Sequence, residues 1–275
     1  MQASLERAAS LLAAQGISIA LAELVQHEAD LLQIELPHGE PRVIRDVVSR
    51  CFATCDVLVA ADEIVVPHLF VSDMDSTIIG QECIDELADY AGIKPQIAAI
   101  TERAMQGELD FAAALRERVA LLEGLNESTV TACLAERIRP NAGARVLVQT
   151  LKARGCRTVL VTGGFHHFAD PVAEELGFDR VVANHLGVSG GSLNGKVLGR
   201  VCDAGAKADV LREERGLLGA NAVALSLGDG ANDVPMLHAA DYGVAFHGKA
   251  AARDCANGSI DRGDLLSVLR LLGLT

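Results

Sequence analysis

Five polar side chains in three short motifs are of the types that bind or transfer phosphate. The motif DMDST carries Asp73 and Asp75, the motif TGG begins with Thr162, and the motif GDGAND carries Asp229 and Asp233. Only one residue separates Asp73 from Asp75. Two carboxylates this close repel each other unless a cation lies beside them. Mg2+ is the usual cation at such clusters, and it takes one or two carboxylates together with substrate phosphate. The three motifs therefore predict a Mg2+ site that also holds a phosphate group.

Gly163 and Lys207 add groups that suit an anion. Gly163 permits backbone N–H groups to approach phosphate oxygens closely. Lys207 is predicted to lie in the first turn of a helix around residues 206–215, which is the unfavourable end of a helix for a cation. A lysine there either binds a ligand or is a solvated surface residue, and the sequence leaves both interpretations open.

Short apolar runs precede the three motifs and predict the strands that position them. The runs cover residues 68–72, 158–161, 181–183, 223–227 and 243–246, and helical stretches lie between most of them. Continuous apolar strands that alternate with helices are typical of a parallel sheet covered on both faces. Ligands of such α/β sheets bind at the carboxyl ends of the strands. The three motifs would meet at that edge.

Two further segments flank or interrupt this α/β pattern. Residues 84 to about 140 contain no strand candidate, so they predict a helical cap inserted over the carboxyl edge of the sheet. The N-terminal residues predict a small α+β module. Its predicted helices and strands are, in order, 4–14, 17–25, 29–36, 42–52 and 57–60. The predicted domains are the module 1–66, the core 67–83 with 141–275, and the cap 84–140.

Within the predicted cap, Arg118 lies on an apolar helical face. The spacing of Phe111, Leu115, Arg118 and Leu122 places all four on one side of a helix. A buried arginine needs an anionic partner. That partner is either a substrate carboxylate or an acidic residue of the cap itself, and the spacing alone favours neither.

The composition excludes several classes of function. The 275 residues are 50% hydrophobic and carry a formal net charge of -13. The chain can therefore bury a large core, but it lacks the basic face that nucleic acid or an anionic membrane requires. The seven cysteines form no CxxC pair, which favours reduced thiols in the cytoplasm over disulfides or a zinc site.

No targeting or membrane segment is evident in the sequence. No apolar run is long enough to span a bilayer. Glu6 and Arg7 stand where a signal peptide would need apolar residues. We therefore expect a cytoplasmic protein that acts on a small molecule and binds neither membranes nor nucleic acid.

The motifs in this order resemble the haloacid dehalogenase (HAD) superfamily of phosphotransferases. DMDST, TGG, Lys207 and GDGAND are similar to its four motifs. ECIDELADYAG (82–92), the segment ITERAMQGELDFAAALRERVALLEGL (100–125) and VVANHLGVSGGSLNGKVLG (181–199) resemble the phosphoserine phosphatase family in particular. The resemblance runs from about residue 68 to beyond Lys249. It implies a HAD-like Rossmannoid parallel sheet with an inserted helical cap.

The resemblance also implies a reaction and its catalytic residues. The reaction is Mg2+-dependent hydrolysis of O-phospho-L-serine to L-serine and phosphate, the last step of serine biosynthesis. Asp73 would be the nucleophile that forms an aspartyl-phosphate, and Asp75 would protonate the leaving oxygen and then activate water. Asp73, the backbone carbonyl of Asp75, and Asp229 would bind Mg2+, and Asp233 would support the waters of the metal.

The residues that the resemblance implies for substrate binding are Glu82, Met105, Phe111, Arg118, Thr162, Gly163, Lys207 and Asn232. The last four would hold the phosphate or lie beside it. Glu82 would meet the substrate ammonium and Arg118 its carboxylate, while Met105 and Phe111 would wall the pocket. The family commonly has serine where this chain has Thr162, which keeps the hydroxyl and adds a methyl group.

Two other activities fit the same catalytic motifs. The phosphoryl group would pass from Asp73 to another amino-alcohol such as homoserine, or it would persist as the signal of a phospho-aspartate receiver. The cap and Arg118 argue against a receiver, because a receiver needs no amino-acid pocket. The N-terminal module resembles a truncated ACT-like module. Amino-acid sensing and a structural role, including assembly of a homodimer, both stay open for it.

Overall fold

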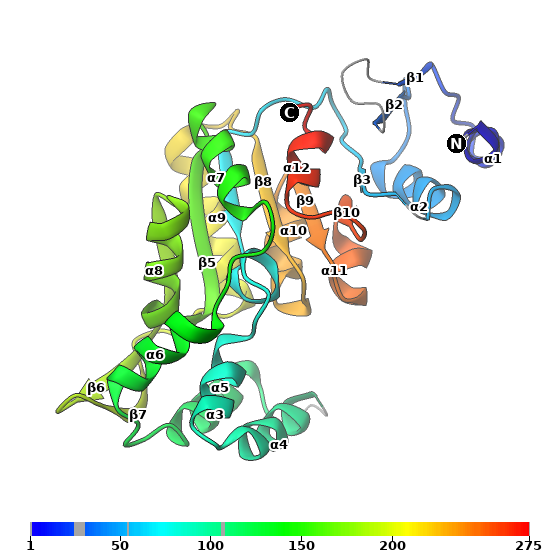
Figure 1. Ribbon diagram of the computed structural model, residues 1–275. Coiled ribbons are helices and arrows are strands. Elements are labelled where there is room, and N and C mark those ends of the chain that lie inside the picture. The colour runs from blue at the N-terminus through cyan, green and yellow to red at the C-terminus, as the bar shows by residue number, and fades with distance from the viewer. Residues whose placement is uncertain (1, 25–30, 54, 106–107, 275) are drawn as a thin grey trace.

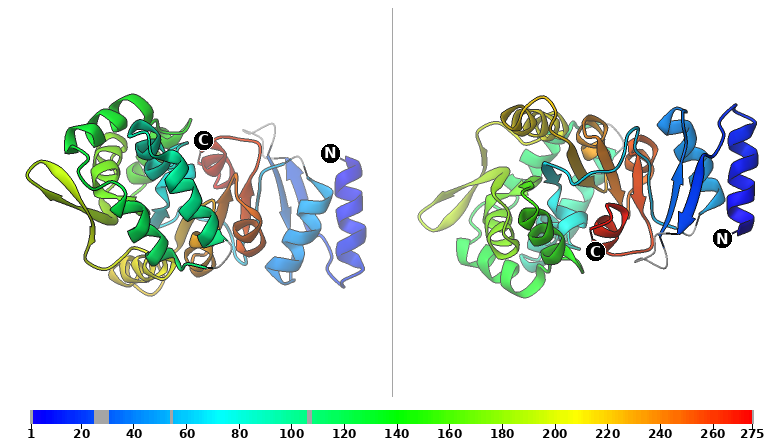
Figure 2. Two further views of the ribbon diagram at one scale, coloured as in Figure 1. Left: turned by 90° about the horizontal axis from the view of Figure 1, so that it is seen from below. Right: turned by 90° about the horizontal axis from the view of Figure 1, so that it is seen from above.

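The computed structural model describes residues 2–24, 31–53, 55–105 and 108–274. An α/β core forms the centre of the molecule, the helical cap lies at one end of the core, and the N-terminal module lies to one side (Figure 1, Figure 2). The chain runs from the module into the core, enters the cap after the second core strand, and returns to complete the core.

Among the described residues, eight strands form the central sheet in the order β3-β10-β9-β8-β4-β5-β6-β7. The strands from β10 to β6 are parallel, whereas the edge strands β3 and β7 pair antiparallel with their neighbours. The prediction of an α/β fold with a mostly parallel sheet is confirmed. The strand bounds are β3 Val57–Leu58, β4 Leu69–Ser72, β5 Arg157–Phe165, β6 Arg180–Ser189, β7 Ser192–Leu198, β8 Ala224–Gly228, β9 Tyr242–Phe246 and β10 Gly258–Ile260.

Alternate residues of the central strands pack into two apolar layers. Phe70 faces the layer that contains residues of α7, α8 and α12, whereas Leu69 and Val71 face the layer that contains residues of α9 and α10. Every residue of β4, β8 and β9 is buried, which is the pattern that continuous apolar runs predict. The helices of the core are α7 Ala144–Ala153, α8 His166–Leu176, α9 Ala204–Leu218, α10 Val234–Ala239, α11 Ala250–Cys255 and α12 Leu266–Leu271.

In the described part of the cap there are four helices, namely α3 Cys83–Tyr90, α4 Lys94–Met105, α5 Phe111–Ala120 and α6 Glu127–Arg137. The described residues between 84 and 140 contain no strand, as the sequence predicts. The hairpin of β6 and β7 extends from the sheet to the cap, where the backbone N–H of Gly124 donates to the Leu193 carbonyl at 2.8 Å and the N–H of Leu193 donates to Leu125 at 2.8 Å. The β6–β7 hairpin of the core sheet is therefore hydrogen-bonded to the segment between α5 and α6 of the cap.

The N-terminal module contains α1 Gln2–Ala13, the antiparallel pair β1 Leu21–Leu24 and β2 Leu32–Glu35, and α2 Pro41–Cys51. Leu12 of α1 and Val47 of α2 belong to a separate apolar cluster. The strands predicted at 17–25 and 29–36 are longer than β1 and β2, and residues 25–30 lie outside the described residues. β3 falls within the range predicted for the module, but it pairs with β10 of the central sheet.

The helices of the described residues include none that is both long enough and apolar enough to cross a bilayer.

Candidate active site

The turn after β4 follows Asp73 and carries Asp75. It spans Met74–Ile78, and Ser76 within it has φ 55° and ψ 9°. This left-handed conformation costs a residue other than glycine roughly 1–2 kcal/mol. The Ser76 hydroxyl donates to Glu82 Oε1 at 2.7 Å, and the Ser76 N–H donates to the Gln81 carbonyl at 3.2 Å. The strained turn thus links the loop that carries Asp73 and Asp75 to the start of the cap.

Lys207 lies between two carboxylates at the carboxyl edge of the sheet. Its Nζ is 2.7 Å from Asp73 Oδ1 and 2.6 Å from Asp233 Oδ1, and its side chain is 1% exposed. Asp203 caps helix α9 by accepting from the Ala206 N–H at 2.9 Å, which fixes the first turn that carries Lys207. The interpretation of Lys207 as a solvated surface residue is therefore wrong.

Asp73, Asp229 and Asp233 are buried, and each offers a carboxylate oxygen within 4.8 Å of the others. Asp233 Oδ2 accepts from the backbone N–H groups of Asp229 and Gly230, both at 3.1 Å. Lys249 at the mouth of the site lies 2.9 Å from Asp229 Oδ2. Buried oxygens gathered in this way fit a hard divalent cation, which prefers carboxylate and carbonyl ligands.

The electrostatics of the cluster also fit a cation. Burial and the neighbouring Asp233 raise the pKa of Asp73 well above its usual value, although Lys207 opposes them. Burial alone would lower the pKa of Lys207, but Asp73 and Asp233 raise it above its usual value. A single ammonium group thus serves two buried carboxylates and cannot neutralise both. Additional positive charge here would favour the ionised form of Asp73.

Asp75 differs from Asp73 in its surroundings. Burial, followed by the negative charge of Glu82, raises the pKa of Asp75 to about 7. Its Oδ2 accepts from the Cys83 N–H at 3.4 Å, while its Oδ1 is buried and has no hydrogen-bond partner among the described residues. A carboxyl group of this kind can carry a proton near neutral pH and donate it to a group that enters the site.

The TGG motif forms the end of β5 instead of the turn that follows it. The Thr162 hydroxyl accepts from the Gly164 N–H at 2.9 Å, and Asn184 Nδ2 donates to the Gly163 carbonyl at 2.8 Å. A Cβ atom on Gly163 would lie 3.0 Å from Phe111 Cζ. Gly163 therefore lets the cap residue Phe111 approach the loop, a second reason for glycine besides backbone access to phosphate.

Glu82 and Arg118 place opposite charges on the cap side of the site. The Glu82 side chain reaches solvent, yet partial burial raises its pKa, which the Ser76 hydrogen bond only partly offsets. Burial lowers the pKa of Arg118, and the charges of Asp85 and Glu82 oppose that effect. Arg118 Nε donates to the Ala114 carbonyl at 3.4 Å, and no carboxylate of the described residues forms an ion pair with it. This arrangement favours a substrate carboxylate over an internal partner.

Asn232 and Met105 are also expected to bind substrate. Asn232 is half-buried and lies two positions after Gly230. A Cβ atom on Gly230 would lie 2.5 Å from Asn232 Oδ1. The side chain of Met105 lies outside the described residues, so its expected role at the pocket wall stays a prediction.

Two residues that contact the site, Lys249 and Asn184, were not predicted from the sequence. Lys249 follows β9, and the rule that found the other motifs, a polar residue just after a core strand, would have found it. Asn184 lies inside β6, where a polar residue gives no such signal. Its Oδ1 accepts from the Cys202 N–H at 2.8 Å, so Asn184 joins the TGG loop to the segment before α9.

A family model for haloacid dehalogenase-like hydrolases matches residues 70–238, which include all three catalytic motifs. The chain belongs to the haloacid dehalogenase-like hydrolase family. It is 46% identical over 209 residues to a phosphoserine phosphatase of Albidiferax ferrireducens, a match that covers 74% of this chain and 88% of the relative. It is 38% identical over 257 residues to a phosphoserine phosphatase of Archaeoglobus fulgidus, covering 92% and 72%.

A solved structure of a phosphoserine phosphatase, described as a phospho-aspartyl intermediate analogue, is similar to this HAD hydrolase in fold. It has a TM-score of 0.68 and 36% sequence identity, and the match covers 74% of this chain and 98% of the solved one. The fold implied by the motifs is therefore confirmed.

Proposed function

We propose that this HAD hydrolase is a Mg2+-dependent phosphoserine phosphatase that forms an aspartyl-phosphate on Asp73. The observation that carries the proposal is the pairing of a phosphate site with an amino-acid site. Asp73, Lys207 and Thr162 lie on the core side, while Glu82 and Arg118 lie on the cap side. The three similar proteins named above are all phosphoserine phosphatases, which supports this choice of substrate.

The chain would supply most of the chemistry through its own side chains. Asp73 attacks the phosphorus and the bond to the serine oxygen breaks, while Asp75 donates its proton to that oxygen. Asp75 then takes a proton from water as the water attacks the aspartyl-phosphate, which releases phosphate and restores Asp73. Lys207 neutralises charge on the phosphoryl oxygens, and the Thr162 hydroxyl and the Gly163 N–H fix their positions.

We propose that Asp73, Asp229 and the backbone carbonyl of Asp75 would hold the Mg2+ ion. Asp233 would position the loop that carries Asp229, because it accepts from the backbone N–H groups of Asp229 and Gly230. When bound, the ion would supply positive charge for the phosphate and for the ionised form of Asp73. On the other side of the site, Glu82 would bind the substrate ammonium and Arg118 its carboxylate. Phe111 would cover the phosphate loop and exclude water.

We also propose the division into a module of residues 1–66, a core of 67–83 with 141–275, and a cap of 84–140. A cytoplasmic location suits the seven cysteines, all of which are unpaired.

The test is phosphate release from L-phosphoserine in Mg2+, in EDTA, and with the Asp73→Asn variant. We expect EDTA or Asp73→Asn to reduce turnover by at least about 1,000-fold, since both remove parts that act as a unit. Asp46→Asn changes an exposed carboxylate of the N-terminal module and is the matched control. Homoserine is added in a parallel reaction. The proposal fails if phosphoserine is not cleaved, or if phosphohomoserine replaces inorganic phosphate as the product.

A further inference from the structure

Asp56 connects the N-terminal part of the chain to a loop near the C-terminus. Its Oδ1 accepts from the backbone N–H groups of Asp261 and Arg262 at 2.8 and 3.0 Å, and its Oδ2 accepts from that of Gly263 at 3.0 Å. Three N–H donors on one ionised carboxylate are charge-assisted bonds, which are stronger than neutral ones. Asp56 directly precedes β3, so the edge pairing of β3 with β10 holds its backbone in place.

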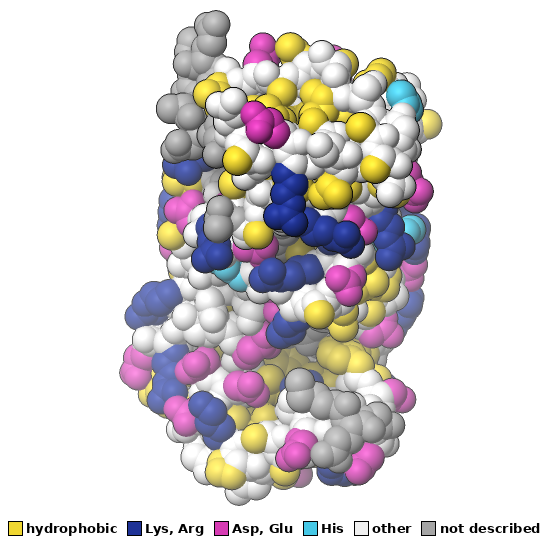
Figure 3. Space-filling model, turned by 90° about the vertical axis from the view of Figure 1, so that its right-hand side faces the viewer, with side chains coloured by type: hydrophobic (Ala, Val, Ile, Leu, Met, Phe, Trp, Pro, Cys, Tyr) yellow, Lys and Arg dark blue, Asp and Glu magenta, His cyan; other side chains and the backbone are white. Residues whose placement is uncertain are grey.

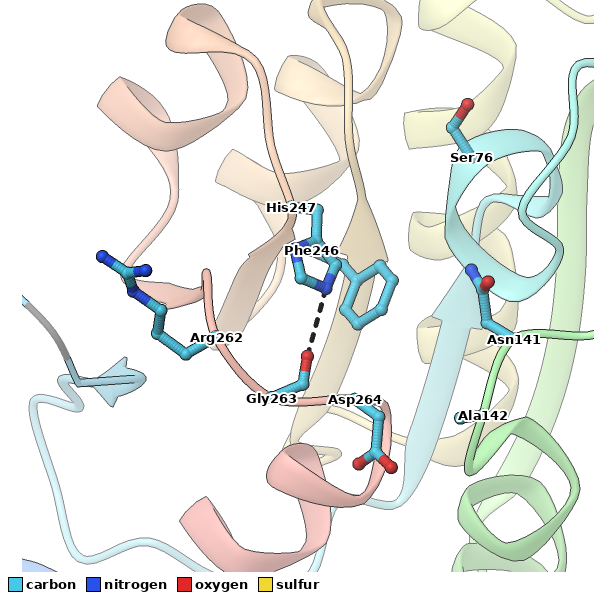
Figure 4. A pocket seen from close by; sticks show the side chains of 8 residues that line it. All are labelled: Ser76, Asn141, Ala142, Phe246, His247, Arg262, Gly263 and Asp264. Atoms are coloured by element: carbon cyan, nitrogen blue, oxygen red, sulfur yellow. Dashed lines mark hydrogen bonds between the residues drawn. The ribbon is translucent and has the colours of Figure 1, made fainter.

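The loop that Asp56 holds is attached to the segment that leaves the cap. The Leu265 N–H donates to the Ala142 carbonyl at 3.2 Å. Gly143 packs so closely on the start of α12 that a Cβ atom there would lie 2.8 Å from the Leu266 nitrogen. His247 Nε2 bonds the Gly263 carbonyl at 3.1 Å and fixes the loop from β9 (Figure 4).

The same segment is bonded to the catalytic turn. The Asn141 N–H donates to the Ile78 carbonyl at 2.8 Å, and Asn141 Nδ2 donates to the Thr77 carbonyl at 2.8 Å. Ile79 and Pro140 form an isolated β-bridge. The two segments that enter and leave the cap therefore lie side by side. We call this pair of segments the cap hinge, because a movement of the cap relative to the core would have to bend them.

A cavity of about 340 Å³ separates the loop from this hinge. Figure 4 shows Gly263 and Asp264 on one side of it and Asn141, Ala142 and Ser76 on the other. Because the space between them is not filled by side chains, the hinge is held on this face mainly by the bond to Leu265 and the contact of Gly143 with Leu266. Both contacts belong to the segment that Asp56 anchors.

We propose that Asp56, where the chain passes from the N-terminal module into edge strand β3, is a positioning residue that fixes the cap hinge and, with it, the placement of Asp75. The connected bonds run from Asp56 through residues 261–265 to residues 141–143 and then to the catalytic turn. The proposal rests on the proposed function only for its activity readout. Its exchange readout needs no substrate, so the two can fail separately.

The experiment compares Asp56→Ala with the control Asp46→Ala in the full chain. Asp46 is an exposed carboxylate of α2, and the structure shows no bond for it among the described residues. Amide hydrogen exchange is followed in peptides that cover residues 261–265 and 139–143. We expect exchange to accelerate at least about 3-fold in both segments of Asp56→Ala, and kcat for L-phosphoserine to fall about 3- to 10-fold with KM within about 2-fold.

Two further variants keep the test decisive. Asp56→Asn retains one acceptor oxygen and should give an intermediate effect even where Asp56→Ala does not fold. Gly263→Ala would push a Cβ atom to 2.6 Å from Asp56 Oδ2 and 1.8 Å from Ser267 Oγ, so it should displace the carboxylate and reproduce the Asp56→Ala result. Faster exchange confined to 261–265, with residues 139–143 and kcat unchanged, would show a merely structural bond and overturn the proposal.

Discussion

Asp73 and Asp75 are one residue apart, yet they lie in different surroundings. Asp73 Oδ1 is 2.7 Å from the buried ammonium group of Lys207, which opposes the rise in the pKa of Asp73 that burial and Asp233 cause. Asp75 contacts the Cys83 N–H only at 3.4 Å, and burial, followed by the negative charge of Glu82, raises its pKa to about 7. Lys207 thus bonds Asp73 and not Asp75, a difference that suits the proposed roles of Asp73 as nucleophile and Asp75 as acid.

The Asp75→Asn variant tests this division of roles. The amide keeps the size of the side chain but cannot donate a proton and take it back. We expect kcat to fall about 100- to 10,000-fold, the usual contribution of general acid–base catalysis, with KM changed by less than about 5-fold. Steady-state kinetics on L-phosphoserine measure both constants. An unchanged kcat would show that Asp75 is not the acid.

The sequence could predict which residues meet at the site but not how they are bonded. Asp73, Thr162 and Asp229 were found because each belongs to a motif at the end of an apolar run. Lys207 bonds Asp73, 134 positions before it, and Asp233, 26 positions after it, and no local pattern encodes such pairs. The contact of Asp56 with residues 261–263 is equally nonlocal, and nothing in the module indicates it.

At the scale of elements, the buried strands β4, β8 and β9 were predictable, whereas β7 and β10 were not. β4, β8 and β9 are apolar on both faces, which is a strong signal in sequence. β7 reads SLNGKVL, in which Asn194 and Gly195 interrupt the apolar pattern, and β10 has only three residues. Pairing with β6 and β9, rather than intrinsic propensity, makes these segments strands.

Gly143 and Gly155 offer a matched pair for the contact of α12 with the hinge. Both have φ 83°, but a Cβ atom on Gly155 meets nothing within 4 Å, whereas one on Gly143 meets the Leu266 nitrogen at 2.8 Å. We expect Gly155→Ala to cost about 1 kcal/mol of unfolding free energy and Gly143→Ala about 2–4 kcal/mol. Urea unfolding measures both. Equal losses of unfolding free energy in the two variants would show that α12 shifts away from the added methyl group without destabilising the fold.

Glu214 on α9 ties the helix to two strands. Its side chain is 3% exposed and accepts from Arg157 Nε of β5 at 3.0 Å and Arg180 Nη1 of β6 at 2.6 Å. Burial alone would raise the pKa of Glu214, but the two arginines lower it below its usual value. A carboxyl group with a depressed folded-state pKa contributes stability above its unfolded pKa, and that stability is lost as the pH falls through the folded value.

Glu214→Gln should therefore cost about 1.5–3 kcal/mol at pH 7, the range for hydrogen bonds to charged groups. The difference from the wild type should shrink as the pH falls below about 4.5, the region where the unfolded carboxyl group takes up its proton. Urea unfolding at several pH values measures the difference. Glu213→Gln is the control, because Glu213 is 58% exposed in its pair with Arg180. A pH-independent difference would show that the charge of Glu214 is unimportant.

Over the whole molecule, the charge is uneven. The chain carries -13, yet Lys and Arg side chains gather across the middle of the face shown in Figure 3, between the module and the cap. Three of the carboxylates, those of Asp73, Asp229 and Asp233, form a buried cluster, with the ammonium groups of Lys207 and Lys249 beside it. Net negative charge in a buried site destabilises the fold until a cation binds.

Divalent cation should therefore stabilise the folded chain. At about 100 times its Kd, a ligand specific for the native state adds about 2.7 kcal/mol, which corresponds to a rise in Tm of roughly 5–10 °C for a chain of this size. Thermal unfolding in Mg2+ and in EDTA measures the shift, and Asp229→Ala should abolish it. The same Tm in both conditions for the wild type would contradict the metal site.

The most direct test of the account is the ratio of kcat/KM for L-phosphoserine to that for an aryl phosphate, in the wild type and in Arg118→Met. The wild type should favour phosphoserine. Arg118→Met should reduce that preference about 10- to 100-fold, because one charged hydrogen-bond donor to the substrate carboxylate is lost, while the aryl phosphate rate stays within about 3-fold. A wild type that favours the aryl phosphate, or a variant that loses both activities equally, would contradict the proposed phosphoserine site.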